Sequence, residues 1–472
     1  MSQFSELLSN YVHSRNIKVY SLAQYCDLDR ANMYKFINGK RTPSSLDLIE
    51  KISNFMQLTP DEKNTFIESW HITQLGADTY YRRKNVAAFF RSFNLPNTDL
   101  SLLQNHQLPV ELNDKAVILN DMNEVNHTLT SIISSEFDKE NGHIQLLIQP
   151  DFDFLSNILS IGWQNPSVSV EQIICLNSRS NTSAEQSTYN IHCLQKILPL
   201  YGLAFQYHCL YYYDNVTSRF GSLTLFPYMI LTSEFTCLLT SDLQKGYLIN
   251  SVHDCKIFQD MFESYKKSAL PLIKPIDNLF FQLQVYDPDI PVHSLQLTPC
   301  LTPYLTPELM EHYITPLLPG RTQFIQYMAN YVEQYFVNTL LNVDTVFSIS
   351  GLRYFMNTGI INEYPREIYT PLALPDRIYM LKQLIQSFER FHYRIIKNDF
   401  CSLENELHLT INSRMGFLMF TTPRDHKLIY LEINEPGFIF TFLDYYESLD
   451  PDSFYTTAEA LQILKNILNE YT

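Results

Sequence analysis

Residues 21–43 constrain the fold more than any other part of the chain, because they predict two short helices joined by a tight link. Asp29 stands where its carboxylate can accept the free backbone N–H groups at the start of the second helix. Gly39 follows the last helical residues and suits a left-handed C-terminal cap. Ala23 is small where two helices must cross closely, and Met33 is apolar and expected to point inward.

The other side of the second helix is polar or small and is expected to face outward: Arg30, Ala31, Asn32, Tyr34 and Lys35. A short helix with such donors has the dimensions to enter a DNA major groove. The guanidinium of Arg30 suits guanine, and the amide of Asn32 suits adenine. Lys40 and Arg41 follow the helix and are expected to hold phosphate. The alternative is that these residues are ordinary solvated charges.

An ordered set of residues extends beyond this segment: Leu22-Ala23, Leu28-Asp29, Met33, Asn38-Gly39-Lys40-Arg41-Thr42-Pro43, Leu48, Ile49 and Ile52. With these residues, positions 4–75 resemble the helix-turn-helix domain of the lambda-repressor/Cro-like, or XRE, transcriptional regulators. Three positions depart from the family pattern, since Val19 replaces a frequent Gln, Asp27 a Gly and Ile37 a Glu. The first departure removes a customary phosphate-positioning side chain. The resemblance implies a DNA-binding domain of five helices.

Helix-start signals agree with five helices in residues 1–75. The sequence Ser44-Ser-Leu-Asp47 is expected to open the fourth helix as a capping box, and Thr59-Pro-Asp-Glu62 to open the fifth. Residues 76–115 are expected to form a linker helix and a loop. We expect Phe89, Phe90 and Phe93 to dock on the body; the alternative is that Arg82, Arg83 and Lys84 touch phosphate.

The remaining residues predict a large mixed α/β body, so that the fold class is multidomain, with an all-α helix-turn-helix domain first. We place an α/β lobe at residues 116–275 and an α+β lobe at residues 276–472. Helices are expected at residues 116–137, 323–341 and 345–357, among others. The order strand, strand, strand, helix recurs at residues 222–262 and 407–442, which suggests two related lobes with a cleft between them.

The net charge of −16 becomes informative when it is divided along the chain. Residues 1–57 carry +2, which leaves −18 for residues 58–472. Attraction to phosphate is therefore confined to the N-terminal module, while an acidic body repels DNA. The charge of −18 is explained equally well if the acidic body merely aids solubility.

The sequence lacks the motifs of the common enzyme classes, including Walker, Rossmann, zinc-protease and nucleophile-elbow signatures. His253-Asp-Cys-Lys256 invites comparison with phospholipase D-type nucleases, but the His and Lys are three apart rather than two. Asp151 with Asp153, and Glu432 with Glu435, are more simply solvated or structural acids. The eight cysteines contain no C-x-x-C pair and are expected to be reduced. We therefore predict no catalytic residue, no metal site and no cofactor.

No run of about eighteen apolar residues predicts a membrane span, and the N-terminus lacks a signal peptide, so a cytoplasmic protein is expected. The sequence predicts a sequence-specific transcriptional regulator that binds double-stranded DNA as a homodimer. Its C-terminal body would sense a small-molecule or peptide effector, mediate oligomerisation, or both. The alternatives are an enzyme or toxin-like body fused to an autoregulatory DNA-binding domain, and a protein-interaction module.

Overall fold

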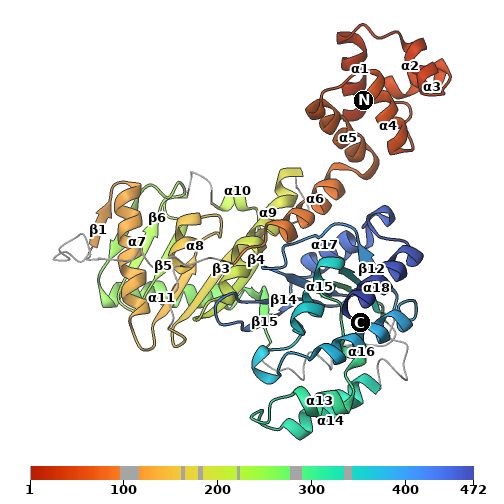
Figure 1. The fold of residues 1–472 in the computed structure, drawn as a ribbon. Helices are drawn as coiled ribbons and strands as arrows, with labels where there is room; N and C mark the ends of the chain where they lie inside the picture. The colour runs from red at the N-terminus through yellow and green to blue at the C-terminus, as the bar shows by residue number, and fades with distance from the viewer. Residues whose placement is uncertain are drawn as a thin grey trace. The chain divides into compact units, whose positions relative to one another are not determined.

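The computed structural model describes residues 2–95, 116–160, 165–178, 184–220, 224–276, 290–333 and 343–472 (Figure 1). Two compact units make up the chain. The first contains Met1–Asn85 with Asn181–Thr188, and the second contains Val86–Ser180 with Tyr189–Thr472. The predicted fold class is confirmed, because a helical N-terminal region precedes a mixed α/β body with two sheets.

The N-terminal region is all-helical: α1 (Gln3–Ser14), α2 (Val19–Tyr25), α3 (Arg30–Ile37), α4 (Leu46–Phe55), α5 (Pro60–Leu75) and α6 (Ala77–Ser92), whose last turns belong to the second unit. Its core gathers one face of each of the first five helices, including Leu8, Met33, Ile49 and Phe66. The predicted capping box at Thr59 is confirmed.

The capping box expected from Ser44 is wrong by one residue. Ser45 is the N-cap of α4, and its hydroxyl accepts a hydrogen bond from the backbone N–H of Leu48. Because Leu48 occupies the third helical position, no acidic side chain can reach back to complete a box there.

The first lobe of the body holds an eight-stranded sheet in the order β1-β7-β6-β5-β2-β3-β4-β8. Its strands are β1 (Ala116–Leu119), β2 (His143–Leu147), β3 (Ser169–Asn177), β4 (Gln206–Asp214), β5 (Tyr228–Leu231), β6 (Thr236–Leu239), β7 (Gly246–Ile249) and β8 (Leu270–Pro271). The helices are α7 (Met122–Phe137), α8 (Asp153–Ser160), α9 (Ala184–Ile197), α10 (Val216–Arg219) and α11 (Val252–Lys266).

The second lobe holds a seven-stranded sheet in the order β12-β11-β10-β13-β14-β15-β9. Its strands are β9 (Ile273–Pro275), β10 (Val292–Leu295), β11 (Val343–Ser348), β12 (Tyr393–Ile396), β13 (Leu407–Ile411), β14 (Gly416–Thr421) and β15 (Leu428–Ile433). The helices are α13 (Pro307–Tyr313), α14 (Arg321–Tyr331), α15 (Ile349–Thr358), α16 (Leu374–Ser387), α17 (Pro436–Glu447) and α18 (Thr457–Tyr471).

The two sheets share one topology. In the first lobe β2, β3 and β4 run parallel, β2 pairs antiparallel with β5, and the β5-β6-β7 meander ends against β1. In the second lobe β10, β11 and β12 run parallel, β10 pairs antiparallel with β13, and the β13-β14-β15 meander ends against β9. Seven strands therefore correspond in order and direction, which agrees with the predicted relation between the lobes.

Two helix predictions in the body are wrong at their N-terminal ends. Residues 116–119 form β1, and residues 343–348 form β11, so α7 and α15 each begin later than expected. Each helix starts at its own cap: Asp121, two residues after the end of β1, and Ser348, the last residue of β11. The helix expected over residues 323–341 is observed as α14, and its second half lies outside the described residues.

The docking predicted for the linker helix is confirmed. Phe89, Phe90 and Phe93 are buried in the core of the second unit, where the ring of Phe90 lies 5.6 Å from that of Phe400 and 6.0 Å from that of Phe442. No helix of the described residues is long and apolar enough to cross a bilayer.

Candidate functional site

The helix predicted to contact DNA, α3, is fixed at both ends. At its start the Asp29 carboxylate accepts the backbone N–H of Asn32 at 2.6 Å. At its end Gly39 has a φ of +68°, and the following N–H of Lys40 donates to the carbonyl of Lys35 at 2.8 Å. One side of α3, which includes Met33, is buried, and its opposite side therefore faces solvent.

The link before α3 also has a defined geometry. Asp27, which replaces the glycine of the related pattern, has a φ of +54°. This left-handed conformation favours glycine, and among other residues it is best tolerated by Asp and Asn. The substitution at Asp27 therefore preserves the tight link between α2 and α3.

The exposed stripe of α3 consists of the residues at helical spacings i, i+1, i+4 and i+5: Arg30, Ala31, Tyr34 and Lys35. Two of these side chains support one another. The Arg30 guanidinium lies 5.4 Å from the centre of the Tyr34 ring and donates to its hydroxyl at 3.3 Å.

Asn32 lies beside this stripe and is only partly exposed. Its amide N–H donates to the Asp29 carboxylate at 2.9 Å, and its carbonyl accepts a hydrogen bond from the Lys35 ammonium at 3.4 Å. An adenine contact by Asn32 would therefore exchange these bonds for bonds to the base.

The segment after α3 carries Lys40 and Arg41, both exposed, and it is anchored on α5. The carbonyl of Pro43 accepts hydrogen bonds from the Trp70 indole at 2.8 Å and from the Gln74 amide at 2.7 Å. These bonds hold the backbone just beyond the two cations.

The Lys and Arg residues of positions 1–75 fall into two groups. One group pairs with carboxylates: Arg15 with Glu62, Lys51 with Asp27 and Asp47, and Lys63 with Glu50. The other group forms no ion pair with any described residue: Lys18, Arg30, Lys35, Lys40 and Arg41. The unpaired group lies at the start of α2, on α3 and just after it. Lys18 was not among the predicted contacts, although its position next to the start of α2 was a usable signal.

The remaining polar candidates have structural roles or lie apart. His253 and Lys256 are exposed on α11, whereas Cys255 between them is buried. Asp153 pairs with Lys196 at 2.7 Å, and Glu435 caps α17 by accepting two backbone N–H groups. Among the described residues, no group of three His, Cys, Asp or Glu side chains is arranged to hold a metal ion.

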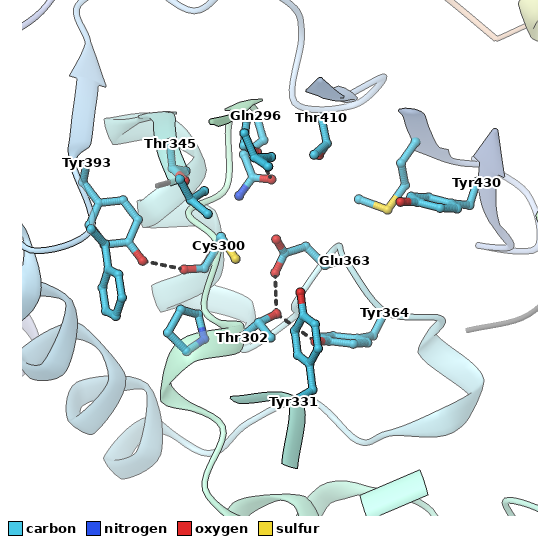
Figure 2. Close-up of a pocket in the computed structure, with 16 residues that line it drawn as sticks. Gln296, Cys300, Thr302, Tyr331, Thr345, Glu363, Tyr364, Tyr393, Thr410 and Tyr430 are labelled. Carbon is cyan, nitrogen blue, oxygen red and sulfur yellow. Dashed lines mark hydrogen bonds between the residues drawn. The ribbon is translucent and has the colours of Figure 1, made fainter. Parts of the chain in front are cut away.

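A cavity of about 120 Å³ lies in the second lobe, on one face of its sheet (Figure 2). Its floor is a row of four residues that the strand register places side by side: Tyr393, Thr345, Ser294 and Thr410. Three of the four are small hydroxyl residues at the centre of the sheet. The cavity follows from their size, because apolar side chains usually fill such positions.

Glu363 and Gln296 direct polar groups toward this cavity, and the Glu363 carboxyl accepts a hydrogen bond from the Thr302 hydroxyl at 3.3 Å (Figure 2). Glu363 is partly buried and lines the cavity, and burial raises the pKa of its carboxyl. Burial likewise raises the pKa of the neighbouring Cys300 thiol.

A second buried acid lies next to this one and is fully satisfied. The Glu406 carboxylate accepts hydrogen bonds from the backbone N–H groups of Leu297 at 2.6 Å and Thr298 at 2.9 Å, and from Asn362 at 2.8 Å. Burial opposes its ionisation, but His408, 2.8 Å away, and these donors hold the pKa of Glu406 at about 2. The same contact raises the pKa of His408, against the effect of burial.

A family model of the Cro/C1-type helix-turn-helix DNA-binding domain matches residues 8–68. The N-terminal region therefore contains a domain of this type, as the sequence predicted. The match includes α2, α3 and the cations that follow α3.

No curated protein matches the chain. Among solved structures, the chain is similar to TrmBL2, an archaeal chromatin protein, at 8% identity and a TM-score of 0.21, with 52% of this chain and 84% of that chain covered. It is also similar to phosphatidylserine synthase of Haemophilus influenzae Rd KW20, at 9% identity and a TM-score of 0.21, with coverage of 84% and 97%. At these TM-scores neither likeness assigns a fold or an activity to the body.

Proposed function

We propose that this chain is a sequence-specific, DNA-binding transcriptional regulator in which α3 enters the major groove. The C-terminal body would sense a small-molecule or peptide effector, mediate assembly, or both. The N-terminal match to a DNA-binding domain supports the first part of this proposal.

The observation that carries the proposal is the distribution of unpaired cations. Four of the five lie on α3 or directly after it, and the acids in other parts of the domain neutralise the other cations. An acidic surface here would have favoured a protein partner instead. Residues 29–41 contain four cations and one acid, Asp29, whose carboxylate is engaged as a helix cap.

The proposed roles follow from chemistry and position. Arg30 would donate to guanine and Asn32 to adenine, and Tyr34 would hold the Arg30 guanidinium in place. Ala31 would pack against a thymine methyl group, and Lys35 would reach a base edge or phosphate. Lys40 and Arg41 would bind phosphate and so fix the register of α3 on the duplex.

We further propose that the protein binds as a homodimer. One module of this size buries only about 600–1,000 Å² on DNA, so specific binding commonly requires two. Two copies related by a twofold axis would read a palindrome whose half-sites lie about one helical turn apart. We assign no reaction, no metal and no cofactor to the body; an enzyme or toxin-like body, or an interaction module, is the alternative.

Selection of DNA fragments tests this proposal. The purified full-length protein is mixed with random duplex fragments, and the retained fragments are sequenced. We expect enrichment of one palindromic motif. Retention without any enriched motif, or no retention at low salt, would contradict the proposal.

A further inference from the structure

The cavity of the second lobe contains polar groups that the fold leaves without partners. The Gln296 side chain is 2% exposed, and its carbonyl accepts a hydrogen bond from Ser294. Its amide NH₂ acts on the Glu363 carboxyl but forms no hydrogen bond of normal geometry with a described residue. The hydroxyls of Thr345 and Thr410 hydrogen-bond to no residue that the structure describes. A buried donor without an acceptor costs about 1–3 kcal/mol. The first lobe also keeps such atoms, among them the Gln149 amide and the Thr236 hydroxyl. In the second lobe, however, the groups line a cavity.

In the first lobe, the aligned positions of the corresponding sheet are filled by side chains and leave no such cavity among the described residues of that row. Its corresponding row contains Leu146 and Ile230, both 0% exposed, together with Gln172 and Cys209. Here the glutamine is satisfied, since its amide donates to the carbonyl of Ile148 at 2.9 Å and its carbonyl accepts from the Tyr207 hydroxyl at 2.6 Å. The hollow in the second lobe is therefore a property of its side chains rather than of the topology.

The charges around the cavity favour a cation. Among the described residues that line it there is no Lys or Arg, and the one carboxyl is that of Glu363. The groups that act on this carboxyl are Cys300, Gln296, Thr302 and His408. Because His408 is already held by Glu406, two acids share one imidazole, and full ionisation would leave one negative charge uncompensated.

The residues that line the cavity limit the size of a ligand and favour a ligand with an apolar portion. Five aromatic rings line the cavity: Tyr331, Tyr364, Phe391, Tyr393 and Tyr430 (Figure 2). Aromatic faces attract cations and pack against short alkyl chains. An apolar cavity of about 150 Å³ holds benzene, so about 120 Å³ suits a molecule of roughly five or six non-hydrogen atoms.

We propose that this cavity binds a small organic ammonium ion. The ammonium group would pair with the Glu363 carboxylate and donate to the hydroxyls of Thr345 and Thr410, while the alkyl part would lie among the rings. An effect of the bound ammonium ion on DNA binding would rest on the proposed function above. The binding of the ammonium ion to the cavity does not rest on it.

Titration calorimetry of the full-length protein tests the proposal with four probes: n-butylammonium, n-butanol, butyrate and erythritol. We expect n-butylammonium to bind at least about tenfold more tightly than n-butanol, and butyrate not to bind. Its affinity should rise as the pH rises above the ordinary carboxyl value of 4.5, because Glu363, whose pKa is raised, must lose its proton to pair with the cation. Binding should release that proton, which calorimetry in two buffers of different ionisation enthalpy measures.

The Glu363→Gln variant keeps the shape of the side chain and should lose the preference for n-butylammonium over n-butanol. Glu367→Gln is the matched control, because it removes the same charge from an exposed residue nearby and should leave both affinities unchanged. Equal binding of n-butylammonium and n-butanol, preferential binding of erythritol or butyrate, or no binding of any probe would overturn the proposal. So would full retention of the ammonium preference by Glu363→Gln.

This experiment contains no DNA. A failure to bind n-butylammonium with intact fragment selection would refute the ligand assignment alone. Ammonium binding without fragment selection would refute the regulator and leave the cavity assignment standing.

Discussion

The two lobes of the body share seven strands in the same order and direction, yet they use one row of the sheet in opposite ways. In the first lobe, Leu146 and Ile230 fill the row and the polar Gln172 is fully hydrogen-bonded. In the second lobe, Ser294 and Thr410 hold the aligned positions, and the Gln296 amide forms no hydrogen bond of normal geometry with a described residue. Two lobes with one topology thus differ in whether their interior is closed.

Glu136 of the first lobe and Glu363 of the second lobe differ in the same way, although Glu406 of the second lobe is satisfied as Glu136 is. Glu136 of the first lobe is 1% exposed and accepts hydrogen bonds from the backbone N–H of His143 at 2.9 Å and from Lys139 at 3.0 Å. These bonds outweigh burial and lower its pKa. No Lys or Arg among the described residues forms an ion pair with Glu363, and burial raises its pKa. In this row of the sheet and at Glu363, the second lobe therefore gives up stability for a polar interior space.

The largest expected effect is a loss of stability in the first lobe. Ile230→Thr places a hydroxyl without a partner in a closed core, which should cost about 2–3 kcal/mol. We expect the calorimetric melting temperature of the body to fall by several degrees. An unchanged melting temperature would show that the first lobe is not closed at this row.

The reciprocal change in the second lobe should have the opposite sign and a smaller size. Thr410→Ile adds apolar volume where the hydroxyl has no partner, and it should stabilise the body by about 0.5–1 kcal/mol. The same calorimetric melt measures it, and loss of n-butylammonium binding should accompany the gain. Destabilisation as large as that of Ile230→Thr would mean that the two rows do not differ.

The smallest expected effects are on the pH dependence of stability, which should differ in sign between Glu363 and Glu136. For Glu363 the pKa is raised in the folded state, so its stabilising contribution is lost as the pH rises above the ordinary value of 4.5. For Glu136 the pKa is lowered, so its contribution is present above 4.5 and lost as the pH falls. Relative to the unmodified protein, Glu363→Gln should therefore gain melting temperature as the pH rises, whereas Glu136→Gln should lose it. Parallel trends for the two variants would contradict the contrast.

Local signals made the N-terminal domain predictable. The caps at Asp29 and Thr59 and the left-handed Gly39 are each determined by a few adjacent residues, and each was identified in the sequence. The strands β1 and β11 were not, because each leads into a helix with no glycine or proline between them. A strand that ends at or close to the helix cap, as at Ser348 or Asp121, reads as the beginning of one longer helix.

The cavity could not be predicted, because its parts are far apart in the sequence. Ser294, Thr345, Thr410 and Tyr393 become neighbours only through strand register, and Glu363 comes from a separate loop. None of these residues belongs to a motif. The only sequence signal was the repeated strand order, which indicated two lobes but not the difference between their interiors.

The central claim is that the exposed stripe of α3 binds duplex DNA. The most direct measurement is the affinity of the selected fragment for the Arg30→Ala/Lys35→Ala protein, by fluorescence anisotropy at fixed salt. Lys51→Ala/Lys63→Ala is the matched control, since it removes two cations of the same domain that are paired with acids. We expect the α3 variant to bind at least about 100-fold more weakly with an unchanged melting temperature, and the control to differ by less than about threefold. Equal affinities of the two double variants would contradict the claim.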